Sequence, residues 1–215
     1  MKLIIGDKNY SSWSMRPWVL LTHFGIPFDE VLIELRRDDT NARILEHSPS
    51  GKVPCLVDDA LGAVWESLAI VETLAERFPQ HPMWPRDPAA RAQARSISAE
   101  MHAGFGALRN EMPLNVREAW PGRGATPASL ADVARVDALW RRCLAASGGP
   151  FLFGEFSIAD AMYAPVVLRF NTYAPPLSPE AGAYAARITA LPAVRAWIDD
   201  ARRETHCVDV YGAQA

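Results

Sequence analysis

The chain reads Asn9-Tyr10-Ser11-Ser12-Trp13-Ser14-Met15-Arg16-Pro17-Trp18 where a short apolar run at residues 2–5 gives way to an apolar-rich segment that ends at Gly25. An apolar run, a polar turn and an apolar segment closed by glycine predict a strand, a loop and a helix. The start of a helix exposes unpaired N–H groups and carries partial positive charge, so it favours an anion, and serine hydroxyls beside it can donate to one. The simpler interpretation is that one of the three serines only caps the helix.

The segments that follow alternate between strand and helix up to residue 78. A second strand is expected within residues 28–35, where apolar and charged positions alternate, and a close strand-helix-strand unit predicts a parallel pair. Pro17 is expected in the first turn of the helix, where its missing N–H is tolerated. Further expected elements are a short helix within 36–46, strands at 53–59 and 63–65, and a helix at 66–78. The last two strands are close enough for an antiparallel hairpin, so the predicted order is βαβαββα.

The second half of the chain is predicted to be helical. Four prolines between residues 78 and 88 exclude a helix or a central strand and indicate a linker. Apolar residues spaced by three or four positions then predict helices at about 89–112, 128–146, 157–173, 179–190 and 192–204. We therefore expect an α/β domain at residues 1–78, a linker at 79–88 and an all-helical domain at 89–215.

The composition limits the possible partners. A chain of 215 residues, 49% of them hydrophobic, can build a sizeable core in one large or two small domains. Its net charge of −3 gives no reason to expect nucleic acid or an anionic membrane as a partner. No apolar run is long enough to span a bilayer, and the first apolar stretch is too short for a signal peptide. Three widely spaced cysteines and five scattered histidines match no metal-ligand spacing, so we expect no metal site and a reducing, cytoplasmic setting.

Three further motifs each have a structural explanation of their own. The Val53-Pro54 dipeptide by itself predicts an ordinary trans bond at the start of a strand, because only about 5–6% of X–Pro bonds in folded proteins are cis. Glu66-Ser67 places a serine at the start of a helix, where serine is a common cap. Ser157 and Asp160 fit a capping box, which is chiefly a folding signal.

Taken together and in this order, these motifs resemble the cytosolic glutathione S-transferases over nearly the whole chain. The turn from Ser11 to Arg16 resembles the serine-type first turn of the zeta and tau classes, in which the active serine lies five residues before an arginine. Four other segments are similar to the loop before the family's cis-proline (48–56), its "E-S-x-A-I" element (65–70), its linker and helix start (78–92) and its C-terminal capping motif (157–161). The chain therefore resembles a serine-type, zeta- or tau-like bacterial member.

The resemblance implies a thioredoxin-like domain followed by an all-helical domain, in a homodimer that uses glutathione as co-substrate. It implies that Val53, next to Pro54 in cis, pairs through its backbone with the cysteinyl part of glutathione. Ser67 would hold the γ-glutamyl carboxylate, Glu66 would face the γ-glutamyl ammonium, and Lys52 would meet the glycyl carboxylate or the peptide backbone. The remaining glutathione-binding residues implied by the resemblance are Ser11, Ser12 and Trp13.

Ser11 is the residue that the resemblance assigns to catalysis, as a hydrogen-bond donor to the glutathione sulfur. The thiolate is the nucleophile, and an unperturbed thiol has a pKa near 8.5. Lowering that pKa by about two units requires about 2.7 kcal/mol of preference for the anion. One hydrogen bond to a charged group supplies about 1.5–3 kcal/mol, and the helix dipole adds about 0.3–1 kcal/mol, so no general base is required. The spacing to Arg16 favours Ser11 over Ser12 and Ser14.

The first turn departs from the family pattern at several positions. It has no cysteine, which argues against a thiol transferase that forms a mixed disulfide, and Tyr10 leaves a tyrosine-type enzyme as a lesser possibility. Trp13 and Trp18 stand where the zeta class has a small or thiol residue and a second arginine, which puts maleylacetoacetate-type isomerisation in doubt. Trp13 has two interpretations of equal weight, a wall of the substrate pocket or a core residue. Cys55, which follows Pro54, is expected to be a buried, inert thiol.

The second-substrate pocket is expected along the first helix of the helical domain. Its predicted lining residues are Trp13, Met101, Phe105 and Arg109, although ordinary core positions explain the apolar residues of that helix at least as well. Gly104 and Gly106 are costly inside a helix and indicate either close approach of a ligand or partner helix, or a kink. Arg109 could hold an anionic substrate or be solvated, and Glu100 could reach across a dimer to the γ-glutamyl group.

The function expected from the resemblance is detoxifying conjugation of the glutathione thiolate to small, hydrophobic electrophiles. A glutathione-dependent isomerase of the maleylacetoacetate type and a peroxidase on the same site are the alternatives. A non-catalytic glutathione-binding protein is disfavoured by the intact set of Ser11, Val53-Pro54 and Glu66-Ser67.

Overall fold

The N-terminal part of the chain folds around a mixed four-stranded sheet in the computed structural model, which describes residues 1–208. Its elements are β1 (Lys2–Gly6), α1 (Ser12–His23), β2 (Asp29–Ile33), α2 (Thr40–Leu45), β3 (Cys55–Asp58), β4 (Gly62–Val64) and α3 (Ser67–Arg77). The strand order is β2-β1-β3-β4, with β1 parallel to β2 and antiparallel to β3, and with β3 and β4 forming a hairpin. The predicted βαβαββα order and both predicted strand pairings are confirmed, and the architecture is thioredoxin-like.

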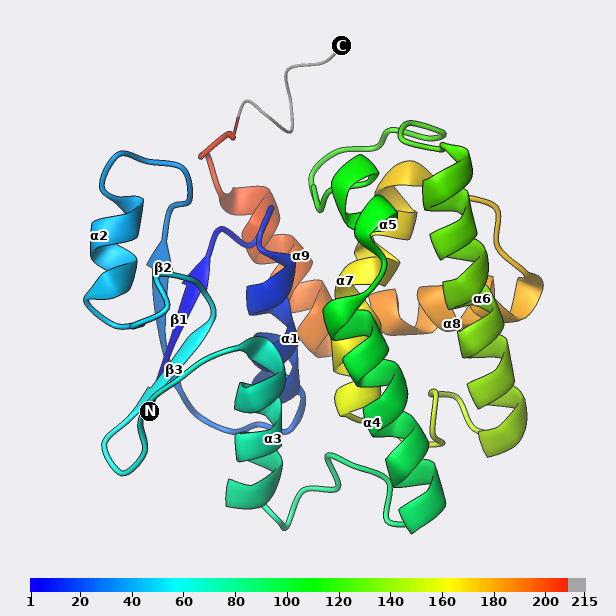
Figure 1. The fold of residues 1–215 in the computed structure, drawn as a ribbon, viewed down its shortest axis with the longest axis horizontal. Helices are drawn as coiled ribbons and strands as arrows, with labels where there is room; N and C mark the ends of the chain where they lie inside the picture. The colour runs from blue at the N-terminus through cyan, green and yellow to red at the C-terminus, as the bar shows by residue number, and fades with distance from the viewer. Residues whose placement is uncertain (209–215) are drawn as a thin grey trace.

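Alternating side chains of β1 connect the sheet to helices on both of its faces. Leu3 and Ile5 belong to the same buried cluster as residues of α1 and α3, whereas Ile4 packs with Ile33 and Ile44 on the side of α2. Figure 1 shows α2 on one side of the sheet and α1 with α3 on the other, between the sheet and the helical part. Because both faces are covered, the successive central residues of β1, Leu3 to Ile5, are all apolar.

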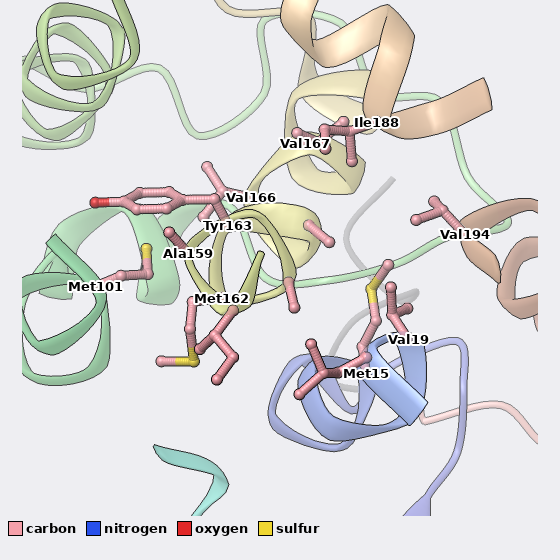
Figure 2. Packing of buried hydrophobic residues seen from close by; sticks show 14 of the residues in the cluster. Met15, Val19, Met101, Ala159, Met162, Tyr163, Val166, Val167, Ile188 and Val194 are labelled. Atoms are coloured by element: carbon pink, nitrogen blue, oxygen red, sulfur yellow. The ribbon is translucent and has the colours of Figure 1, made fainter. Parts of the chain in front are cut away.

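The second part of the chain is mainly helical and is organised around α7. Its helices are α4 (Pro88–Ala103), α5 (Gly106–Glu111), α6 (Pro127–Ser147), α7 (Ile158–Tyr173), α8 (Pro179–Ala190) and α9 (Pro192–Arg203). α7 is buried along nearly its whole length and contacts α1, α4 and α8, so it joins the two parts of the molecule (Figure 2). At its start, Ser157 and Asp160 form the predicted capping box, in which the Ser157 N–H donates to the Asp160 carboxylate at 2.9 Å.

The single helix predicted for residues 89–112 is wrong, because the chain breaks between α4 and α5. Phe105 adopts a left-handed conformation with φ 60° between the two helices. A Cβ added to Gly104 would lie 2.8 Å from a backbone carbonyl oxygen one turn earlier, which favours glycine at this position. The break agrees with the kink interpretation of the glycines, and it removes the common helical side on which Met101, Phe105 and Arg109 were predicted.

Pro17 also lies elsewhere than predicted. Because α1 begins at Ser12, Pro17 is its sixth residue and falls outside the first turn. Its ring offers no N–H to the carbonyl of Trp13, four residues earlier, so α1 lacks one helical hydrogen bond near its start. The helix is held instead by its packing, since residues 14–21 are all buried.

Candidate functional site

Two adjoining cavities lie where the turn before α1 meets the loop before β3. The first cavity has a volume of about 400 Å³ and is lined by Trp13, Ser50, Lys52, Val53, Pro54, Trp65 and Glu66. The second cavity has a volume of about 390 Å³ and is lined by Tyr10, Ser11, Ser12, Trp13, Leu35, Ile44, Gly51, Lys52, Val53, Arg109, Pro113, Leu114 and Arg169. Both volumes are typical of small-molecule sites. Trp13, Lys52 and Val53 line both cavities and form their common wall.

Ser11 caps the start of α1 and also lines the second cavity. Its Oγ accepts the Ser14 backbone N–H at 3.4 Å and donates to Ser14 Oγ at 2.7 Å, and Ser14 Oγ accepts the Gly6 N–H at 3.1 Å. The capping interpretation is therefore correct, and it leaves room for a second role because a hydroxyl can turn its hydrogen toward a ligand. Ser12 lines the same cavity, and its Oγ accepts from Arg169 Nη2 at 3.2 Å.

Arg16 is a buried guanidinium that connects α1 to the start of α3. It is 1% exposed, and its Nη1 donates to Ser67 Oγ at 3.2 Å. Burial, together with the charges of Arg109 and Arg169, lowers the pKa of Arg16 well below its usual range. Within the described residues, the Nε of Arg16 has no hydrogen-bond partner. A buried cation with an unsatisfied donor, beside the N-terminus of a helix, is suited to binding an anion.

Trp13 stands between two guanidinium groups. The Cζ atoms of Arg16 and Arg109 lie 4.2 and 4.6 Å from the centre of its ring, and the ring of His102 meets its edge at 5.2 Å between centres. Cations favour the faces of an indole because the ring carries partial negative charge there. Trp13 is only half-buried and lines both cavities, so the structure places it as a wall of the pocket.

Of the other predicted glutathione-binding residues, Lys52, Val53, Pro54 and Glu66 line the first cavity, whereas Ser67 is fully buried at the start of α3 and lines neither cavity. Glu66 is the residue before α3, and its carboxylate lies 3.8 Å from His102 Nε2. The bond between Val53 and Pro54 is cis, so the expectation from the dipeptide alone is wrong and the one implied by the resemblance is right. Val53 lies two residues before Cys55, the first residue of β3 that pairs with β1. Lys52 is exposed and lines both cavities.

The predicted lining of the second-substrate pocket needs correction. Trp13 and Arg109 line the second cavity, whereas Met101 and Phe105 do not. Met101 is fully buried and lies beside α7 (Figure 2), and Phe105 is 6% exposed. The physical reason is the break after α4: Met101 lies on α4 and not on the helix that carries Arg109, and Phe105 is the left-handed residue that caps the start of α5.

The apolar wall of the second cavity could not be predicted. It is formed by Leu35, Ile44, Pro113 and Leu114, which come from segments far apart in the chain. No local pattern marks such residues, because their proximity depends on how the two parts of the chain pack. Arg169 did carry a signal, since it is the one Lys or Arg within α7, and arginine is rarely buried unless it is paired.

Glu100 and Cys55, which were also considered from the sequence, have structural roles within this chain. Glu100 receives two hydrogen bonds of 2.8 and 3.0 Å from Arg135 of α6, and its reach across a dimer stays a prediction. Cys55 is buried, and burial raises the pKa of its thiol, which agrees with an inert cysteine.

No helix within residues 1–208 is long and apolar enough to cross a bilayer. Over the same residues, no group of three or more His, Cys, Asp or Glu side chains is arranged to hold a metal ion.

Comparison with known proteins gives matches in both parts of the chain. Residues 10–77 match the family described as Glutathione S-transferase, N-terminal domain, and residues 91–200 match Glutathione S-transferase, C-terminal domain. The chain is 32% identical over 172 residues to a probable maleylacetoacetate isomerase of Caenorhabditis elegans, covering 79% of each protein. It is 29% identical over 208 residues to the glutathione S-transferase GstB of Escherichia coli K12, covering 90% of this chain and 96% of the relative.

Solved structures agree in fold. A maleyl pyruvate isomerase, described as a bacterial glutathione S-transferase of the zeta class, superposes with a TM-score of 0.72 at 22% identity, covering 96% of this chain and 100% of that chain. A glutathione transferase homolog from Burkholderia with bound glutathione superposes with a TM-score of 0.70 at 24% identity, covering 94% of this chain and 97% of that chain. At this level of identity, these structures support the fold alone.

Proposed function

The chain belongs to the glutathione S-transferase family, and from this premise we propose that it joins the sulfur of glutathione to small electrophilic molecules. The relatives named as maleylacetoacetate isomerase and as glutathione S-transferase are enzymes of this superfamily, and so is this chain. In our proposal the first cavity holds the γ-glutamyl end of glutathione, the second receives the electrophile, and the sulfur lies at their common wall. The observation that carries the proposal is the buried pair of Arg16 and Ser67 at the end of α3 nearest to Trp13.

Arg16 and Ser67 supply the main support for the glutathione site. Because the guanidinium donates to Ser67 Oγ, the hydroxyl hydrogen of Ser67 is available to a carboxylate at the start of α3. An anion near the Arg16 Nε would satisfy a buried donor whose unmet hydrogen bond otherwise costs about 1–3 kcal/mol. Glu66, the neighbour of Ser67 in the chain, lines the first cavity, where it would face the γ-glutamyl ammonium. This set of donors and acceptors fits the γ-glutamyl end of glutathione.

Ser11 is our candidate for stabilising the thiolate. Its hydroxyl donates to Ser14 Oγ, and that oxygen keeps the Gly6 N–H as a donor when the Ser11 hydrogen turns toward a sulfur. A hydrogen bond to the anion supplies about 1.5–3 kcal/mol, which corresponds to about 1–2 units of thiol pKa. Ser12 is the competing donor, because its Oγ accepts from Arg169 and its own hydrogen is available.

The pKa of enzyme-bound glutathione tests this assignment. It is measured from the ultraviolet absorbance of the thiolate as a function of pH. We expect Ser11→Ala to raise that pKa by about 1–2 units. Starting from a bound-thiol pKa of about 6.5, this lowers the thiolate fraction, and with it kcat/KM, by about 3- to 25-fold at about pH 7. Ser96→Ala, on the exposed side of α4, is the matched control and should leave both quantities unchanged. A raised pKa in Ser12→Ala but not in Ser11→Ala would reassign the role, and failure to bind glutathione would refute the proposed function.

A glutathione-dependent isomerase is the second candidate function. Relatives named as maleylacetoacetate isomerases favour it, among them those of Caenorhabditis elegans and Pseudomonas aeruginosa. Both reactions use the same thiolate, so the site residues assigned above apply to either. Turnover of a chloronitrobenzene, of a cis-enedione acid and of an organic hydroperoxide would separate transferase, isomerase and peroxidase as the main activity.

We also propose a homodimer, because members of this family are generally dimeric. Light scattering after gel filtration should give twice the mass of one chain, and a monomer would contradict the proposal. The scattered cysteines and the net charge of −3 support a cytoplasmic location without a nucleic-acid partner.

A further inference from the structure

The charged residues that line the second cavity are all basic. They are Lys52, Arg109 and Arg169, and none of the lining residues is acidic. Apolar side chains and hydroxyl groups, including that of Ser11, form most of the remaining wall. Positive charge concentrated in a cleft with walls of low dielectric constant raises the local concentration of anions. The composition of this cavity therefore suits an anion with an apolar skeleton.

Arg109 is held in this wall by contacts on two sides. Its Nε donates to the Gly104 carbonyl at 2.9 Å, and its Nη2 donates to the carbonyls of Met101 and His102 near the end of α4. The last carbonyls of a helix carry partial negative charge, so they favour a cation. On the other side, the ring of Trp13 lies 4.6 Å from the guanidinium carbon. The guanidinium is thus fixed before any ligand arrives, which lowers the entropic cost of binding one.

The charge of Arg109 is not neutralised by an ion pair. Among the described residues, none of the salt bridges includes it. Asp132 attracts it at longer range, but the carboxylate of Asp132 is used by the Leu108 N–H at 3.0 Å. The Nη1 of Arg109 is buried without a hydrogen-bond partner within residues 1–208. A half-buried cation without a counterion gains most from a ligand that supplies one.

We propose that Arg109 is a specificity-determining residue, which makes the enzyme prefer electrophiles that carry a carboxylate over neutral electrophiles of the same shape. Trp13 is the corresponding positioning residue, because its ring holds the guanidinium in place. Lys52 borders both cavities and is assigned to glutathione itself, whereas Arg109 borders the second cavity and not the first. This inference rests on the proposed function, since it concerns the second substrate of the same reaction.

The test compares two electrophiles that differ in charge, a chlorodinitrobenzoate and the corresponding primary amide. In both reactions the glutathione sulfur bonds to the ring carbon that carries chlorine, chloride leaves with the bonding electrons, and the thiol proton passes to solvent. The measured quantity is kcat/KM divided by the rate constant of the uncatalysed reaction, which corrects for intrinsic reactivity. We expect the wild-type enzyme to prefer the benzoate by about tenfold or more, and high salt to reduce this preference.

Substitutions then locate the preference. Arg109→Gln should lower the benzoate-to-amide ratio by about tenfold, which is about 1.4 kcal/mol, and Arg109→Lys should restore part of it. Trp13→Leu should also lower the ratio, because the guanidinium loses the ring that positions it. Arg141→Gln is the matched control: it removes an exposed arginine of α6 that pairs with Asp137, and it should leave the ratio unchanged.

A second measurement does not depend on any variant folding. Dinitrobenzoate and dinitrobenzamide lack the leaving group, and we expect the benzoate to inhibit the wild-type enzyme at lower concentration. Equal inhibition constants for dinitrobenzoate and dinitrobenzamide in the wild-type enzyme would overturn the inference and leave the proposed function intact. An unchanged benzoate-to-amide ratio of kcat/KM in Arg109→Gln would do the same. No turnover of either electrophile, together with no binding of glutathione, would refute the proposed function and this inference with it.

Discussion

Asp160 makes a contribution to stability that depends on pH and can be measured. Its carboxylate is fully buried, where it accepts hydrogen bonds from the backbone of Leu152, from the backbone and hydroxyl of Ser157, and from the hydroxyl of Tyr184. Burial outweighs these bonds and raises the pKa of Asp160 from 3.8 to about 6. The native protein therefore holds a proton at this site more tightly than the unfolded chain does.

The direction of the pH dependence follows from proton linkage. Between pH 3.8 and about pH 6 the native state binds more protons at Asp160 than the unfolded state, so the free energy of unfolding falls as pH rises. The contribution is fully present below pH 3.8 and is lost once the pH has passed about 6. The total loss is about 3 kcal/mol, and roughly half of it falls between about pH 5 and about pH 8.

Asp160→Asn tests this prediction, because asparagine has nearly the same shape and does not titrate. The amide presents an NH₂ group to donors that point at the carboxylate, so the variant should be less stable by about 1–3 kcal/mol. Urea unfolding of both proteins at each pH should show the advantage of the wild type shrinking by about 1–2 kcal/mol from about pH 5 to about pH 8. Because the other titrating groups are the same in both proteins, their contributions cancel in the difference between the two free energies of unfolding. An advantage that stays constant or grows with pH would refute the reasoning.

Two further substitutions test a close approach of the backbone and a buried ion pair. Gly104→Ala should lower the free energy of unfolding by about 1–3 kcal/mol, because the new Cβ would meet a carbonyl oxygen at 2.8 Å. Gly106→Ala is the control, because its Cβ would meet open space. Equal melting temperatures for the two variants would contradict the argument. Lys8→Met should lower the free energy of unfolding, measured in urea, by about 1–3 kcal/mol. The substitution removes a buried ammonium that lies 2.8 Å from the Glu30 carboxylate and 2.6 Å from the Asp200 carboxylate. An unchanged unfolding midpoint would show that solvent replaces this ion pair fully.

Most of the fold could be predicted because its signals are local. The strand at Lys2–Gly6 and the helix at Ile158–Tyr173 each lie within one or two residues of the predicted range. The break after α4 could not be predicted as such, because apolar residues continue at spacings of three and four across Gly104. At the break, Arg109 folds back onto carbonyls near the end of α4, and this contact has no signature in the apolar pattern.

The two cavities differ in how much of them could be predicted. The first is built from short motifs, since Val53-Pro54 and Glu66 follow one another along the chain and converge through the hairpin between them. The second joins the turn before α1 to α5 and α7, and it exists only after the helical part has docked. Arg109 and Arg169 therefore could not be assigned to a common site from their positions in the sequence, although Arg169 is the one Lys or Arg of a largely apolar helix.

One indole belongs to both cavities, so in the proposed arrangement glutathione and the electrophile do not bind to independent surfaces. A ligand that shifts Trp13 also moves the wall of the neighbouring cavity and disturbs the guanidinium groups of Arg16 and Arg109 on its faces. The binding free energies of the two substrates are therefore coupled, and linkage requires each to change the affinity for the other by the same factor. A substitution of Trp13 that favours a new electrophile changes the affinity for glutathione as well. The apolar residues Leu35, Pro113 and Leu114 border the second cavity and not the first, so substitutions there can change electrophile preference with the least effect on glutathione affinity.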